Sequence, residues 1–286
     1  MVNVCAMNHT EALRRIPFAC PLDGLPLEMG ERSLACATGH SFDISAQGYV
    51  NLLPVQFKAS RDPGDSKPMV DARRRVLGHG LFDPLADALT EVVRAHLAPE
   101  ALLVDAGCGD GFYTARLADA VPGVAVLGID ISKWAVAAAA KRHRGMAWAV
   151  ATNKRLPVLP GSVGMITSLF GFETWDAWAG LQHAGQLVTV VDAGPRHLLE
   201  LREIIYESVR THDAPPNDAA LASGYTLLGT ESVVFAREIR DAAILSDILE
   251  MTPHGHKTTP AARATVAALD RLHLTFDAVI RVYRRG

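Results

Sequence analysis

From about residue 80 onward, short apolar runs alternate with stretches whose apolar positions recur at helical spacing. Apolar runs bounded by turn residues are typical of buried strands, and their alternation with helices indicates βαβ units. The predicted strands cover residues 101–107, 124–130, 146–152, 163–170, 186–194, 231–239 and 274–283. The predicted helices cover residues 112–121, 132–143, 198–212 and 262–272. The pattern therefore predicts an α/β fold built around a parallel sheet.

The first 79 residues lack this alternation. Residues 1–56 are turn-rich and polar, with cysteine, histidine and glycine at short intervals, and residues 57–79 run from a Pro-Gly turn into a basic, helix-like segment. We therefore predict a small module at 1–56, a basic linker at 57–79 and a Rossmann-like domain at 80–286.

Composition narrows the class of protein. Apolar residues make up 49% of the 286 residues and charged residues 21%, as in ordinary globular proteins. Four cysteines are too few for a disulfide scaffold, which favours a reducing cytoplasm. No run approaches the roughly 20 apolar residues of a membrane span, and the first residues do not look like a secretory signal. A net charge of −3 means that any nucleic-acid surface must be a local patch.

A glycine loop, VDAGCGDGFYT, follows the first predicted strand. Gly107, Gly109 and Gly111 alternate, whereas a dinucleotide fingerprint needs its third glycine at the position of Phe112. No Gly-Lys-Ser/Thr follows, so a Walker phosphate loop is excluded. Glycines let the backbone turn sharply and approach a ligand, although a turn without any ligand would have the same spacing.

Two acids end neighbouring strands beside this loop. Asp105 lies at a strand end, where open α/β sheets place their ligand crevice. Asp130 ends the next strand at the spacing expected of a carboxylate that binds ribose hydroxyls; the alternative is a helix N-cap before Ser132. The constellation resembles the class I S-adenosylmethionine-dependent methyltransferases, which implies that cofactor, with Thr152 and Asn153 at the usual adenine position.

The region after the fourth strand bears on the methyl acceptor. Residues 168–175 read SLFGFETW and lack the Asn/Asp-Pro-Pro-aromatic motif of exocyclic amine methylases. Cys108 lies inside the glycine loop and is expected to pack rather than to act as a nucleophile. Four aromatic residues form either a wall for a base or part of the core: Phe170, Phe172, Trp175 and Trp178.

The N-terminal module has the spacing of a small zinc ribbon, with Cys20 and Asp23 followed by Cys36 and His40. The adjoining GYVNLLPVQFKASRDPGDSKPMVDARR, together with AGPRHLLELR and LEMTPHGHK, resembles the bacterial 23S rRNA guanine-N1 methyltransferases, which include macrolide-resistance members. The resemblance covers nearly the whole chain. It implies methyl transfer to guanine N1 in an rRNA hairpin, a zinc module that helps to recognise this hairpin, and a homodimer that clamps it.

The same resemblance places cofactor contacts at Phe82, Gly109, Asp110 and His197. In the family the zinc ligands are three cysteines and a histidine, whereas here Asp23 replaces the second cysteine. An aspartate can bind zinc but weakens a soft, closed site. Cys5 could substitute from upstream, or the ribbon has lost its ion and survives by packing.

Guanine N1 must lose a proton before it attacks the methyl group, so a carboxylate near the acceptor is expected to act as the base. By position the candidates are Glu173, Asp176 and Asp192. The basic residues of 57–75 exceed the acidic ones by three, and this excess could contact phosphates or form a solvated helix face.

The sequence is also consistent with two other functions. The departures at Asp23 and at 168–178 would suit an enzyme recruited to a small-molecule acceptor. A non-catalytic, cofactor-binding rRNA-associated protein is the second alternative, although the intact glycine loop and Asp130 argue against it.

Overall fold

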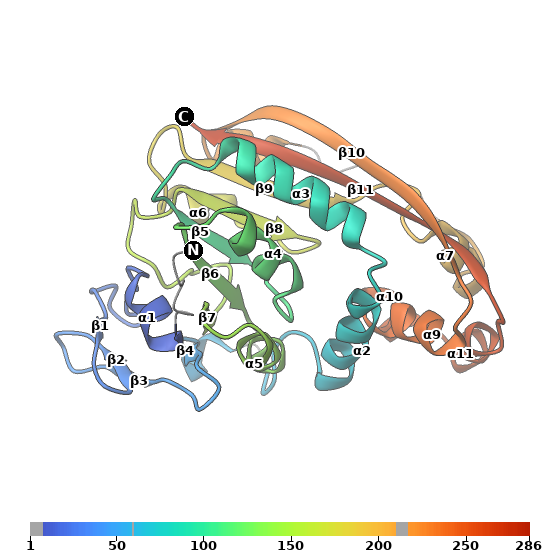
Figure 1. Cartoon of the computed structure of the whole chain (residues 1–286), viewed down its shortest axis with the longest axis horizontal. Helices are drawn as coiled ribbons and strands as arrows, with labels where there is room; N and C mark the ends of the chain where they lie inside the picture. The colour runs from blue at the N-terminus through green and yellow to red at the C-terminus, as the bar shows by residue number, and fades with distance from the viewer. Residues whose placement is uncertain (1–7, 59, 210–216) are drawn as a thin grey trace, which may run out of the picture.

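The protein is described by a computed structural model, which covers residues 8–58, 60–209 and 217–286. Five parallel strands form the centre of an eight-stranded sheet in the order β10-β11-β9-β8-β5-β6-β7-β4 (Figure 1). The central strands are β5 (Leu102–Ala106), β6 (Ala125–Asp130), β7 (Ala147–Val150), β8 (Met165–Leu169) and β9 (Leu187–Ala193). The structure thus confirms the parallel α/β sheet expected from the apolar runs.

Two long antiparallel strands extend one side of this sheet. β10 (Tyr225–Ile239) pairs with β11 (Leu272–Arg285), and β11 pairs antiparallel with β9. Both strands are longer than predicted. The six residues of β10 that precede the predicted start read YTLLGT, which threonine and glycine interrupt too often to form the apolar run that marks a buried strand.

The helices cover both faces of the sheet. The longer ones are α2 (Lys67–Gly78), α3 (Asp83–His96), α4 (Phe112–Ala120), α5 (Lys133–Arg142), α7 (Leu199–Ile205), α9 (Ala242–Glu250) and α11 (Pro260–Ala267). The shorter ones are α1 (His9–Arg14), α6 (Trp175–Ala179), α8 (Asp218–Ala222) and α10 (Pro253–Lys257). α7 is shorter than the predicted helix 198–212, of which the last three residues lie outside the described part. In the described residues no helix is long and apolar enough to cross a membrane.

The two faces of β5 show how the N-terminal module is attached. Leu103 packs in a core cluster with residues of α3, α4, α7 and α9. Its neighbours Leu102 and Val104 point to the other face, where they share a cluster with Phe18 and Trp178. The module therefore packs directly on the sheet of the Rossmann-like domain.

The module holds a small antiparallel sheet of β1 (Glu28–Met29), β2 (Ser33–Ala35) and β3 (Ser41–Asp43). The next strand, β4 (Val50–Asn51), joins the main sheet instead and pairs in parallel with β7, Val50 opposite Ala149. A short 3-10 turn, Val55–Phe57, then leads toward α2. The range 1–56 thus contributes the edge strand of the large sheet, which the sequence pattern did not predict.

Candidate functional site

The three loop glycines have different surroundings. All have positive φ, at +105° for Gly107, +55° for Gly109 and +83° for Gly111. A Cβ on Gly107 would meet no atom within 4 Å, whereas a Cβ on Gly111 would lie 2.7 Å from the Trp148 ring. Gly107 therefore leaves the crevice open, and Gly111 lets α4 pack closely on the core.

Asp105 lies beneath the loop. Its side chain is buried, and its two carboxylate oxygens accept hydrogen bonds from the hydroxyls of Thr114 at 2.5 Å and Thr167 at 2.9 Å. Burial raises the pKa of Asp105 to about 6. The structure thus gives this predicted cofactor residue a supporting position, because its carboxylate ties α4 and β8 to the strand that carries the loop.

Asp130 lies at the carboxyl end of β6, beside the loop. One carboxylate oxygen accepts the backbone N–H of Gly109 at 3.0 Å and the other accepts that of Ser132 at 2.7 Å. Ser132, not Asp130, caps α5, because its hydroxyl accepts from Ala135 N. The N-cap alternative for Asp130 is therefore wrong, and its carboxylate is held against the glycine backbone.

Segment 61–66, which contains the Pro-Gly turn, lies beside the carboxyl end of β6. Ser132 donates its hydroxyl to the carbonyl of Asp65 at 2.6 Å, and a Cβ on Gly64 would lie 2.7 Å from Ile131. Lys133 pairs with Asp62 at 2.5 Å. This turn therefore packs on the residues that follow Asp130.

Arg73 in α2 is a site residue that sequence reasoning missed. A Cβ on Gly109 would lie 3.7 Å from its Nη1, and its guanidinium pairs with Asp65 and donates to Met251 O at 3.1 Å. Asp110 is buried nearby, with Arg142 at 3.5 Å. Burial raises the pKa of Asp110, and the two arginines oppose this effect.

The three consecutive arginines of segment 57–75, which lie in α2, are paired with carboxylates. Besides Arg73, Arg74 pairs with Asp71 at 3.3 Å, and Arg75 pairs with Asp247 of α9 at 2.6 Å. Figure 1 shows α2 beside α9, so two motifs that are distant in sequence, DARRR and LEMTPHGHK, lie side by side. The arginines of α2 thus hold elements together.

Phe82 and His197 belong to an aromatic cluster with Phe276 and Phe170. Phe82 is buried edge-on against Phe276 at 4.9 Å, and His197 lies 5.5 Å from the Phe170 ring. Burial lowers the pKa of His197 to about 4, so the ring is neutral at pH 7. The cluster therefore brings together Phe82 and His197, two of the cofactor contacts that the family resemblance implies.

The loop after β8 is fixed by Asn153. Its side-chain amide donates to Ala106 O at 3.3 Å and to Phe172 O at 3.4 Å, and Thr174 donates to its carbonyl at 2.8 Å. The neighbouring Thr152 accepts the backbone N–H of Lys154 at 3.4 Å. Asn153 therefore joins the ends of β5, β7 and β8.

The predicted acids separate into two groups. Glu173 and Asp192 both contact Arg281, Glu173 at 3.6 Å. Burial and the charge of Asp192 raise the pKa of Glu173. Asp176 is exposed, accepts from Ser223 at 2.6 Å and lines the same surface pocket as Glu173. Glu173 and Asp192 are therefore the two candidates that share Arg281.

The aromatic residues after β8 also separate. Trp175 and Trp178 are buried among core residues, whereas Phe170 and Phe172 are exposed. Phe170 has a φ of +50°, which is uncommon for an aromatic residue and turns the chain at the strand end. Cys108 is buried in the cluster around Trp148, as expected of a packing residue.

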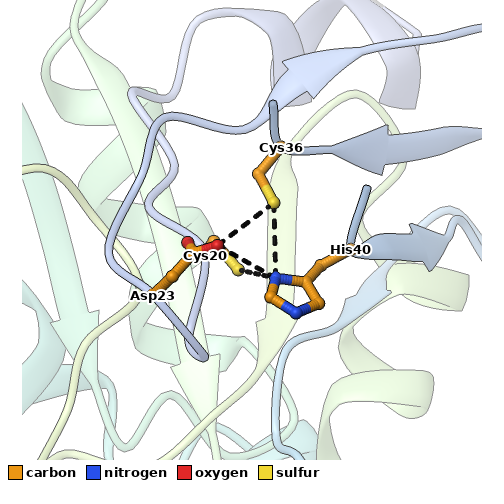
Figure 2. Close-up of side chains that lie close together, drawn as sticks. All are labelled: Cys20, Asp23, Cys36 and His40. Carbon is orange, nitrogen blue, oxygen red and sulfur yellow. Dashed lines mark hydrogen bonds and ion pairs between the residues drawn. The ribbon is translucent and has the colours of Figure 1, made fainter. Parts of the chain in front are cut away.

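Cys20, Asp23, Cys36 and His40 converge in the N-terminal module, with their ligand atoms within 4.8 Å of one another (Figure 2). His40 Nδ1 lies 3.5 Å from Cys20 Sγ, 3.4 Å from Cys36 Sγ and 3.0 Å from Asp23 Oδ2. Tetrahedral zinc with its usual bond lengths would separate such atoms by roughly 3.3–3.8 Å. The donor set is therefore compatible with Zn²⁺; Cys5 lies outside the described residues.

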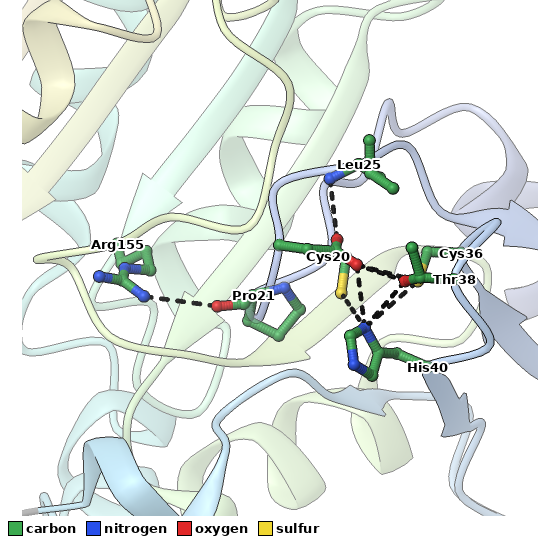
Figure 3. Close-up of polar contacts among 8 residues, drawn as sticks. Cys20, Pro21, Leu25, Cys36, Thr38, His40 and Arg155 are labelled. Carbon is green, nitrogen blue, oxygen red and sulfur yellow. Dashed lines mark hydrogen bonds and ion pairs between the residues drawn. The ribbon is translucent and has the colours of Figure 1, made fainter.

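Neighbouring groups hold this cluster in place (Figure 3). Thr38 donates its hydroxyl to Asp23 at 2.5 Å, which lowers the pKa of that carboxyl, and Leu25 N donates to the same carboxylate at 3.0 Å. Arg155 reaches from the Rossmann-like domain to the carbonyl of Pro21 at 3.4 Å. The aspartate thus has the outer hydrogen bonds that orient a metal ligand.

Comparisons with known proteins agree with this geometry. Residues 18–61 match a family model described as "RlmA, N-terminal", and residues 103–194 match one described as "Methyltransferase domain". A "Putative 23S rRNA (guanine-N(1)-)-methyltransferase" of Micromonospora griseorubida is 32% identical, with 93% of this chain and 95% of that protein covered. The "23S rRNA (guanine(748)-N(1))-methyltransferase" of Streptomyces fradiae is 30% identical, with 89% and 91% covered.

Among solved structures, one similar chain comes from a complex between the Haloferax volcanii Trm112 methyltransferase activator and a "putative methyltransferase". It is 18% identical, with a TM-score of 0.50 over 80% of this chain and 100% of that one, which supports the fold alone. The matches confirm the predicted class I methyltransferase fold and S-adenosylmethionine as its cofactor. The chain belongs to the family of 23S rRNA (guanine-N1)-methyltransferases.

Proposed function

We propose that this protein transfers a methyl group from S-adenosylmethionine to N1 of a guanine in a 23S rRNA hairpin. The observation that carries the proposal is the similarity to guanine-N1 methyltransferases over about nine-tenths of the chain, which includes both the metal-binding module and the cofactor crevice. A cytoplasmic location and a homodimer that clamps the hairpin belong to the same proposal.

The cofactor residues take separate roles. Gly107 and Gly109 leave room for the methionine portion, and the Asp130 carboxylate binds the ribose hydroxyls. Asp110, Gly111 and Asp105 support the loop from below. Thr152 and Asn153 border the adenine, and Phe82 and His197 close the end nearest the acceptor. When bound, S-adenosylmethionine supplies an electrophilic methyl group.

The acceptor step needs a base and alignment. The bond from N1 to the methyl carbon forms as the bond from that carbon to sulfur breaks, and the N1 proton passes to a carboxylate. Glu173 is the proposed base, because its raised pKa makes it a stronger proton acceptor than an exposed glutamate. Asp192 and Arg281 hold it in position. Alignment of N1 with the methyl carbon contributes much of the rate.

The metal cluster supports the module that recognises the RNA. Zn²⁺ bound by Cys20, Asp23, Cys36 and His40 would cross-link the loops before β1 and around β3. Arg155 connects the metal-binding loop to the segment that follows β7, because it contacts Pro21, which lies between Cys20 and Asp23.

The direct test is incubation of the protein and labelled S-adenosylmethionine with unmodified 23S rRNA, and separately with a metabolite extract. We expect label in the rRNA only. Label in a metabolite and none in RNA would select a small-molecule acceptor, and cofactor binding without turnover would select a non-catalytic protein.

Asp130→Ala serves as the cofactor-binding variant, with the exposed Asp119→Ala as its control. Calorimetry should show that Asp130→Ala binds the cofactor at least about tenfold more weakly than the wild type, whereas Asp119→Ala binds it equally well.

A further inference from the structure

Exposed aromatic rings gather at one part of this molecule. In the described chain, the phenylalanines and tryptophans with more than a third of their surface exposed are Phe57 at 37%, Trp134 at 38%, Phe170 at 43% and Phe172 at 89%. Phe170 and Phe172 follow β8, and Trp134 begins the helix after β6. Phe57 precedes the turn that packs against the residues after β6. All four thus lie near the strand ends that border the crevice.

Contacts and chain neighbours link the segments that carry the four rings. Phe172 O accepts from Asn153, and the Arg155 guanidinium, two residues further on, lies 4.4 Å from the centre of the Phe57 ring. Lys58, adjacent to Phe57, lines a shallow depression together with Lys133 and Trp134. At the other end, Phe170 lies against His197. We call these rings, from Trp134 through Phe57 and Phe172 to Phe170, the aromatic arc.

The charges of the aromatic arc favour an anionic partner. Lys133 Nζ lies 4.8 Å from the centre of the Trp134 ring, and Arg155 covers one side of Phe57. Lys58 and Lys154 add two more cations. Two neighbouring carboxylates have cationic partners, Asp62 with Lys133 and Glu173 with Arg281, whereas Asp176 lines the same pocket as Lys154. Lys58, Lys154 and Arg155 therefore supply the positive charge that a phosphate would meet.

We propose that the aromatic arc is the surface on which unpaired nucleotides of the substrate RNA stack, with Phe170 and Phe172 nearest the target guanine. The inference rests on the proposed function and names the residues that read the hairpin loop. Single-stranded RNA is commonly bound by aromatic rings that stack on bases while nearby cations contact phosphates. A guanine inside a helix has its N1 in a base pair, so the target base must be unpaired when it is methylated.

The test compares RNA binding by ring variants. Phe57→Ala, Trp134→Ala and Phe172→Ala should each weaken binding of the 23S rRNA hairpin by about 5- to 150-fold. Binding of a blunt duplex of the same stem should not change. Cofactor affinity should also stay unchanged for Phe57→Ala and Trp134→Ala. The matched controls Leu228→Ala and Val234→Ala remove side chains of similar exposure, 42% and 44%, on β10.

Conservative variants separate stacking from simple apolar burial. Phe172→Trp should bind the hairpin as the wild type does, whereas Phe172→Leu should bind as weakly as the alanine variant. Equal hairpin affinity for the wild type and all ring-to-alanine variants would overturn the inference. If the wild-type protein methylates the guanine in that same experiment, the proposed function survives that failure.

Trp134 offers an independent optical readout. The other tryptophans, Trp148, Trp175 and Trp178, are no more than 6% exposed, so acrylamide should quench mainly Trp134. Hairpin RNA should protect this fluorescence, and the quenchable component should be lost in Trp134→Phe. Full quenching in the presence of saturating hairpin would contradict the stacking position of Trp134.

Discussion

At the scale of single residues, identical residue types have different tasks in the crevice. Gly107 and Gly111 are four positions apart and both have positive φ, yet one faces open space and the other faces Trp148 and Ala139. Asp105 and Asp130 end neighbouring strands, yet one is bonded to internal hydroxyls and the other to the loop backbone. Position relative to the loop decides the role in each pair.

The glycine pair gives the first prediction. Gly111→Ala should lower the free energy of unfolding by about 1–3 kcal/mol more than Gly107→Ala, because both add backbone strain but only the first overlaps the core. Gly107→Ala should instead lose cofactor affinity. Thermal unfolding and calorimetry on both variants measure this. Equal loss of stability in the two variants would contradict the account.

The buried carboxyl gives the second prediction. The pKa of Asp105 is about 6 in the folded protein against an ordinary 3.8, so the folded state holds this proton more tightly. Its contribution to stability therefore falls as pH rises from about 4 to about 6, by about 3 kcal/mol in total. Asp105→Asn stays neutral and should gain stability relative to the wild type over that interval. A difference in melting temperature that is constant with pH would show that the carboxyl does not titrate there.

At the scale of elements, α2 packs against the glycine loop. Its arginines pair with Asp65 in the preceding turn and Asp247 in α9, and Arg73 lies over Gly109. Burial raises the pKa of Asp130, and the positive charge of Arg73 opposes that effect. The positive charge of Arg73 in α2 therefore favours the ionised forms of the buried Asp110 and Asp130.

Arg73→Ala should lower cofactor affinity by about tenfold, since its loss removes a charge-assisted contact and leaves nearby carboxylates without this cation. Arg74→Ala is the control, because Arg74 lies one position along the same helix, is half exposed and pairs with Asp71. Calorimetric titration with S-adenosylmethionine measures both. The role assigned to Arg73 would be excluded if the two variants bound the cofactor equally well.

The metal cluster makes the fourth prediction. Asp23→Ala should lower zinc affinity, whereas Asp23→Cys should raise it above the wild type, because a thiolate is the softer ligand. Competition with a chromophoric chelator measures the affinities, and elemental analysis gives the metal content. Unchanged affinity in Asp23→Ala would remove the aspartate from the ligand set.

The sequence predicted those features whose residues lie close together along the chain. The glycine loop, the acids at strand ends and the cysteine–histidine spacing all depend on short intervals along the chain. β4 was missed because two residues form no recognisable pattern. The contact of Arg73 with the loop and the sharing of Arg281 by Glu173 and Asp192 depend on packing and strand register, which only the folded chain defines.

At the scale of the whole molecule, the metal module, the cofactor crevice and the aromatic arc form one continuous structure. The module shares a core with the sheet, β4 extends that sheet, and Arg155 connects the metal loop to Phe57. A chain built in this way can place an RNA loop and the methyl donor in fixed relation to each other. The atom that this arrangement would present to the methyl donor is guanine N1.

Mapping the methylated atom tests that claim most directly. After reaction with the wild-type protein, 23S rRNA should yield 1-methylguanosine on nuclease digestion and mass spectrometry. Reverse transcription should stop next to one hairpin guanine, because methylation at N1 blocks base pairing. RNA treated with Asp130→Ala should give neither signal. A methyl group on any other atom or base, or on no RNA at all, would contradict the account.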